Sequence, residues 1–126
     1  MNGETSSQEH LEFYQRFQSF WAAPTGARVS ELIAPHAEIH FTGEETMSGA
    51  VYAEWMSNLL AGLPDLVVTP VDYAGSGDRI YIFWRAAATI NGAHRNYYGV
   101  DRFRIENGMA VEEYVIFDSA TLHGPD

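Results

Sequence analysis

The sequence of 126 residues contains no cysteine and no lysine. The absence of cysteine excludes disulfide bonds, a thiolate nucleophile and zinc–sulfur sites. The absence of lysine excludes catalysis through a Schiff base on a lysine side chain. The seven basic residues are all arginine, and 17 acidic residues bring the net charge to −10. This balance, without a basic cluster, argues against nucleic acid as a partner.

Long apolar segments are missing as well. No run approaches the roughly 18–20 residues that cross a bilayer, and the N-terminal segment MNGETSSQEH lacks the basic and apolar regions of a signal peptide. We therefore expect a cytoplasmic protein that does not bind membranes. The glycine motifs of nucleotide-binding sites and the Gly-x-Ser-x-Gly motif of serine hydrolases are also absent, so we expect no cofactor.

The spacing of apolar residues predicts three helices and a short strand, followed by a meander of four strands. Asn-Gly pairs at 91–92 and 107–108 are typical of hairpin turns between such strands. Helices followed by an antiparallel sheet indicate an α+β fold in which the helices cover one sheet face. The first helix is expected from residue 8 to the stop at Pro24, further helices over residues 27–34 and 50–63, and strands over residues 37–42, 66–74, 79–90, 96–105 and 109–118.

The length fits a single domain over residues 1–126, with residues 1–7 and 119–126 as tails. The long strands carry hydrophobic or aromatic residues on both faces, and the strand over residues 79–90 does so most clearly. The helices cover one face, and the other face also needs a cover. We therefore expect a homodimer that forms through the outer face of the sheet.

Two carboxylates in the last third of the chain are candidates for acid–base catalysis. Asp101 lies between Val100 and Phe103, and Asp118 follows an apolar strand segment. A charge among such neighbours is costly to bury, and burial raises the pKa of a carboxyl group toward neutral pH. Carboxyl groups of this kind act as general acids and bases. The alternatives are a surface ion pair for Asp101 and a strand-end cap for Asp118.

His40 is a further candidate base because imidazole titrates near neutral pH, and a structural role in its strand is the alternative. The five histidines show no metal-ligand spacing, so we expect no metal site. Aromatic side chains are candidates for lining a ligand cavity, although Trp55 also fits core packing and Trp84 also fits contact with a dimer partner. These candidates are Tyr14, Phe17, Trp55, Trp84, Tyr97, Phe103 and Phe117.

The ending GVDRFRIENGMAVEEYVIFD, the aromatic first helix and the strand–loop–helix segment over residues 37–63 together resemble one known family. They look like the SnoaL-like branch of the NTF2-like superfamily, the polyketide-cyclase-type proteins. The resemblance covers residues 9–118 and implies a cone-shaped, curved antiparallel sheet wrapped around three N-terminal helices. In SnoaL-like cyclases an acidic residue on the late strands is the general acid–base, and Asp101 or Asp118 would match that position.

The resemblance implies a cofactor-free cyclase or isomerase that acts on a hydrophobic polyketide-, steroid- or terpenoid-like molecule. Asp118 would then be the acid–base group and Asp101 the orienting group, with His40, Tyr14 or Arg85 completing the site. An epoxide hydrolase of the limonene-epoxide-hydrolase type is one alternative, and it requires Arg85 to face the cavity and bind a carboxylate. A non-catalytic ligand-binding or dimerisation module is the other, because one fold serves many functions.

Overall fold

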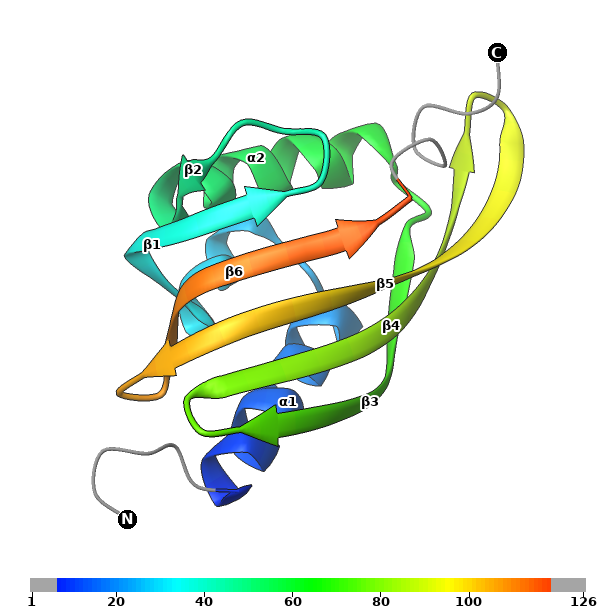
Figure 1. Ribbon diagram of the computed structural model, residues 1–126. Coiled ribbons are helices and arrows are strands. Elements are labelled where there is room, and N and C mark those ends of the chain that lie inside the picture. Colours follow the sequence, from blue (N-terminus) through cyan, green and yellow to red (C-terminus); the bar gives the residue numbers. More distant parts are fainter. Residues whose placement is uncertain (1–6, 119–126) are drawn as a thin grey trace.

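The structure, a computed structural model, describes residues 7–118, and Figure 1 shows how the elements are arranged. Ser7 begins the first helix, and the rest of the two expected tails, residues 1–6 and 119–126, lies outside the described residues. Two α-helices, one 3-10 helix and six strands follow one another in the order α1 (Ser7–Ala22), η1 (Gly26–Glu31), β1 (Ile33–Phe41), β2 (Met47–Ser48), α2 (Gly49–Gly62), β3 (Val67–Ser76), β4 (Arg79–Ile90), β5 (Ala93–Glu106) and β6 (Met109–Phe117).

The six strands form one curved sheet that does not close into a barrel, and both α-helices lie against the same face (Figure 1). The strand order is β2-β1-β6-β5-β4-β3. The four long strands at the end of the chain pair antiparallel with their neighbours in sequence, as the Asn-Gly turns predict for β4–β5 and β5–β6. The first strand, β1, instead runs parallel to β6. The α+β fold expected from the sequence is confirmed.

The second helix differs from its prediction. The sequence predicts a helix over residues 27–34 that Pro35 ends. In the structure a short 3-10 helix ends at Glu31, and β1 begins at Ile33. Pro35 therefore lies inside a strand. The pairing of β1 with β6 shifts register between Ile33 and Glu38, and a strand tolerates proline at such an irregularity because no ladder hydrogen bond is lost there.

The core lies between the helices and the inner face of the sheet. Phe13 and Phe17 recur at helical spacing along α1 and are buried against the sheet, where the ring centroids of Phe13 and Phe103 are 4.8 Å apart. Along β4, buried and exposed residues alternate, so that Ile82 and Trp84 face the helices. Each large side chain buried in this way stabilises the fold by about 1.5–3 kcal/mol.

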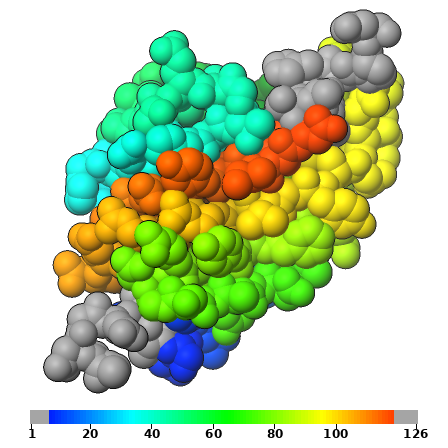
Figure 2. Space-filling model, in the orientation of Figure 1, coloured from blue at the N-terminus to red at the C-terminus, as the bar shows by residue number. Residues whose placement is uncertain are grey.

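The outer face of the sheet, which Figure 2 shows, stays open in the single chain. Tyr81, Phe83, Tyr98 and Ile116 are exposed there, and the rings of Phe83 and Tyr98 stack with centroids 5.5 Å apart. These side chains agree with the apolar outer face expected from the sequence, while the homodimer itself stays a prediction. Among residues 7–118, no helix is both long and apolar enough to span a membrane.

Candidate functional site

Two buried carboxyl groups meet on the inner face of the sheet. Asp101 of β5 is 6% exposed and Glu113 of β6 is 2% exposed. Strand pairing brings them together, because Asp101 lies opposite Val115 and Phe103 lies opposite Glu113 in the register of the two strands. Alternation along each strand then directs all four side chains toward the helices.

The two carboxyl groups shift each other's pKa. Burial raises the pKa of Glu113 well above its usual range, and the neighbouring charge of Asp101 and the hydrogen bond to it raise this pKa further. Burial also raises the pKa of Asp101, but the bonds from Glu113 and Trp84 oppose that rise. The Trp84 Nε1–H donates to Asp101 Oδ1 at 2.8 Å. Of the two groups, Glu113 has the more strongly raised pKa, so a single proton held by the pair is favoured on Glu113.

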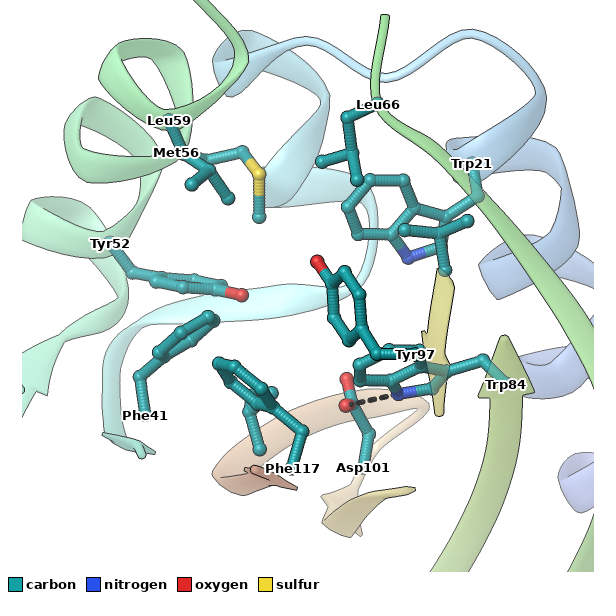
Figure 3. A pocket seen from close by; sticks show the side chains of 12 residues that line it. Trp21, Phe41, Tyr52, Met56, Leu59, Leu66, Trp84, Tyr97, Asp101 and Phe117 are labelled. Carbon is teal, nitrogen blue, oxygen red and sulfur yellow. Dashed lines mark hydrogen bonds between the residues drawn. The ribbon is translucent and has the colours of Figure 1, made fainter. Parts of the chain in front are cut away.

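Two tyrosine hydroxyl groups point into the main cavity, and that of Tyr97 lies at the end of its ring away from Asp101 (Figure 3). Tyr52 of α2 is buried, and its burial and the nearby carboxyl groups of Glu113 and Asp101 raise the pKa of its phenol well above the usual value. Burial also raises the pKa of Tyr97 on β5. Both phenols consequently stay protonated at neutral pH and can donate a hydrogen bond to a ligand oxygen atom in the main cavity.

The carboxyl pair lies between two cavities. The main cavity, shown in Figure 3, has a volume of about 40 Å³. When the open space up to its mouth is included, the volume is about 440 Å³. The inner cavity, toward α1 and η1, has a volume of about 20 Å³ by the measure that gives 40 Å³ for the main cavity. Trp21, Tyr52, Met56 and Asp101 line both cavities, whereas Glu113 lines the inner one.

Most of the site residues predicted from the sequence lie around these cavities. Asp101 stands between the two, as its apolar neighbours in the sequence predict. Aromatic candidates line the main cavity at Trp84, Tyr97 and Phe117, and the inner cavity at Phe17 and Phe103. These positions follow from the alternation of β4, β5 and β6 and from the inner stripe of α1.

Asp118 and His40 lie away from both cavities. Asp118 is exposed directly after β6, one position beyond Phe117, so alternation turns it from the inner face. His40 lies on the outer face of β1, where its ring stacks on Tyr114 with centroids 4.1 Å apart and its Nε2 lies 3.0 Å from a carboxylate oxygen of Glu38. The catalytic roles predicted for these two residues have no support in this geometry, and we do not propose them.

Three further candidates also lie outside the cavities. Tyr14 packs against Tyr73 of β3, with ring centroids 4.5 Å apart. Trp55 packs against Phe41 with centroids 4.4 Å apart, which agrees with its alternative role in packing. Arg85 is exposed on the outer face of β4, so the geometry that the epoxide hydrolase alternative requires is not present.

The outer face carries one group of side chains with metal-ligand chemistry. Ligand atoms of Glu38, His40 and Glu112 lie within 4.8 Å of one another. Glu112 already has a cationic partner, because Arg102 Nη2 lies 2.7 Å from Glu112 Oε1. His40 is likewise in contact with Glu38. These two contacts account for the cluster, and we propose no metal site there.

Sequence reasoning missed two residues of the site, Glu113 and Tyr52. Alternation along β6 groups Glu113 with Val115 and Phe117, and this pattern was the available signal for an inward-facing carboxyl group. Tyr52 belongs to the apolar stripe of α2, where the sequence does not separate a core residue from a cavity residue. Its place beside the carboxyl pair is a product of the tertiary packing.

Comparisons with known proteins agree with this architecture. Residues 14–113 match the family model of the SnoaL-like domain. No curated protein gave a match to this chain.

Several solved structures have the same fold. A protein from Jannaschia sp. CCS1, provisionally named a SnoaL-like polyketide cyclase, is 15% identical over 99% of this chain and 97% of its own, with a TM-score of 0.76. IdmH from Streptomyces antibioticus, provisionally named a polyketide cyclase, is 20% identical over 90% of this chain and 95% of its own, with a TM-score of 0.76. A protein from Catenulispora acidiphila DSM 44928 with a ketosteroid isomerase-like fold, in complex with trimethylamine, is 14% identical over 88% of each chain, with a TM-score of 0.78. At such identities the likeness shows the fold alone.

Proposed function

The chain belongs to the SnoaL-like domain family, and from this premise we propose that it is a cofactor-free enzyme that moves a proton on a hydrophobic, ring-containing ketone. The reaction class would be cyclisation, which the provisional names of two solved relatives suggest for those proteins, or isomerisation. One observation carries the proposal: the carboxylate of Asp101 is buried in an apolar cavity beside protonated hydrogen-bond donors.

Asp101 is the proposed general base. It would take a proton from the carbon next to the carbonyl group, so that the C–H bond breaks and its electron pair forms an enolate. The Tyr52 and Tyr97 hydroxyl groups, which point into the same space, would donate to the oxygen that gains the negative charge (Figure 3). In an isomerisation, Asp101 would then return the proton to another carbon. In a cyclisation, the enolate carbon would form a bond to the carbon of a second carbonyl group, the π electron pair of that group would move to its oxygen, and Asp101 would give its proton to the resulting alkoxide.

Glu113 has a different proposed role. It lines the inner cavity, and because its pKa is the more strongly raised of the two, it would hold the proton of the carboxyl pair and leave Asp101 ionised. Without this neighbour and Trp84, burial alone would favour the neutral form of Asp101 and remove the base. Glu113 is therefore a positioning residue that maintains the charge of the base.

Two alternatives remain for the experiment to separate. The epoxide hydrolase interpretation loses its required contact, because Arg85 is exposed on the outer face. The non-catalytic binding module predicts aspartates outside a filled cavity, which fits Asp118 but not Asp101. The inward position of Asp101 favours the enzyme over the binding module.

The test is the exchange of hydrogen for deuterium next to the carbonyl group of 2-tetralone, a neutral bicyclic ketone, followed by NMR in D₂O. The protein should accelerate this exchange, and Asp101→Asn should lower the rate constant by about a hundredfold to ten-thousandfold. The matched control is Asp118→Asn, which removes an exposed carboxylate outside the cavities and should leave the rate unchanged. Exchange at the buffer rate with the natural protein, or full activity in folded Asp101→Asn, would contradict the proposal.

A further inference from the structure

The two cavities are small for a ring-containing ligand. By the measure that gives them about 40 and 20 Å³, one water molecule occupies roughly 10–15 Å³ and a cavity that binds benzene has about 150 Å³. A bicyclic ligand at Asp101 therefore needs additional space, and that space must be continuous with the main cavity.

A larger hollow adjoins the main cavity from outside. This outer hollow, of about 430 Å³, lies between the end of α1 and the beginning of β3. Trp21, Leu66 and Val68 line both the outer hollow and the main cavity, so these three side chains form the wall between the two spaces. The remaining lining residues of the hollow include Gln18, Ala22 and Pro24.

Trp21 is the key member of this wall. Among the described residues that line the main cavity, the inner cavity and the outer hollow, it is the one that borders all three. It lies in the last turn of α1, is half-buried, and packs edge-on against Phe20 with ring centroids 5.0 Å apart. Of the side chains in these walls, Trp21 is therefore the one whose rotation would change all three spaces.

The chemistry of the walls defines the ligand. The described residues around the three spaces include no arginine or histidine, and their ionisable acids are Asp101 and Glu113. A carboxylate or phosphate group on the ligand would meet no cation and would be repelled by Asp101. The walls suit an uncharged, flat molecule with a single polar group near the carboxyl pair.

We propose that the three spaces form one elongated binding site for an uncharged molecule of several rings, with Trp21 as the movable partition and the outer hollow as the subsite for the distal ring. This inference rests on the proposed function, since it places the reacting end of the ligand at Asp101. The distal ring would lie between Ala22 and the beginning of β3.

The test compares two uncharged probes, 2-naphthol and the longer 6-phenyl-2-naphthol, by isothermal titration calorimetry. Burial of the additional ring should make the longer probe bind about tenfold more tightly or better. Ala22→Arg places a long side chain in the outer hollow and should abolish this advantage while leaving 2-naphthol unaffected. The control is Ala61→Arg, an exposed alanine near the end of α2, which should change neither dissociation constant.

Trp21→Phe tests the partition, because a smaller ring should speed association of the longer probe by about threefold or more in stopped-flow fluorescence. Equal affinity of the two probes, an equal effect of both arginine variants, or slower association with Trp21→Phe would overturn the inference. Failure to bind either probe would overturn it together with the proposed function. The two proposals can also fail separately. If the longer probe binds more tightly and Ala22→Arg removes this difference, while Asp101→Asn keeps full exchange activity, the subsite is supported and the proposed role of Asp101 is rejected.

Discussion

The neighbouring residues Glu112 and Glu113 lie on opposite faces of the same strand and have opposite surroundings. Glu112 is half-buried on the outer face and pairs with Arg102 at 2.7 Å. Glu113 is 2% exposed on the inner face, and its neighbour there is another acid, Asp101. The outer pair neutralises its charges locally, whereas the inner pair places two acids side by side in an apolar space.

This comparison separates what stabilises the protein from what suits it for catalysis. An exposed or half-exposed ion pair contributes little to stability and is screened by salt. A buried acid pair without a cation costs stability, because one carboxylate must be desolvated. Sites that retain such a cost are frequently functional, and the inner face is where the ligand cavities lie.

The largest effect on stability is expected at Gly99, on the inner face of β5. A Cβ atom there would lie 2.2 Å from the Trp84 ring, which in turn holds Asp101. Gly99→Ala should lower the free energy of unfolding by about 3 kcal/mol in urea denaturation and displace the indole from Asp101. Gly62→Ala, where no atom lies within 4 Å, is the control and should be neutral or slightly stabilising. If Gly99→Ala lowers the free energy of unfolding no more than Gly62→Ala does, the Trp84 ring moves aside without cost.

The second prediction concerns the apolar part of the outer face and the expected homodimer. Ile116→Glu adds a charge to a 56% exposed residue of β6 and should weaken dimerisation by roughly 2 kcal/mol, or about thirtyfold, in sedimentation equilibrium. Val51→Glu, at a residue of α2 with the same 56% exposure, is the matched control and should leave dimerisation unchanged. A natural protein that sediments as a monomer would reject the dimer.

The third prediction compares Glu113→Gln with Glu112→Gln. Because the pKa of Glu113 is higher in the folded state, the folded protein keeps a proton that the unfolded chain releases above about pH 4. Stability should therefore fall as the pH rises from there through the raised pKa of Glu113. Glu113→Gln should flatten this slope and gain about 1 kcal/mol or more at pH 8, with little gain at pH 4.

Glu112→Gln should retain the slope of the natural protein, because it removes a carboxylate that Arg102 already neutralises. Thermal unfolding measured from pH 4 to pH 8 follows both variants. The prediction would be wrong if the slope disappeared in Glu112→Gln or persisted unchanged in Glu113→Gln, because the pH dependence would then not come from Glu113.

Local patterns in the sequence predict the fold well and the carboxyl pair only in part. Alternation and the Asn-Gly turns suffice for the meander and for the inward position of Asp101. A two-residue turn after Glu106 would place Glu112 opposite Phe103, but the pairing shifts register between Arg104 and Ile105 and places Glu113 there instead. Such a bulge depends on packing across the sheet, and it leaves no clear mark in a single sequence.

The smallest expected effect is the coupling between Arg102 and Glu112. A double-mutant cycle with Arg102→Met and Glu112→Gln should give about 0.5 kcal/mol in a monomer, and less in 1 M salt, where the Debye length is about 3 Å. The side chains of the pair are 17% and 23% exposed, and a partner subunit on the outer face would remove that exposure. The cycle should therefore be measured twice, in the natural protein and in the Ile116→Glu background. A coupling that is larger and less sensitive to salt in the natural protein would place this ion pair inside the dimer interface, whereas identical values would place it outside.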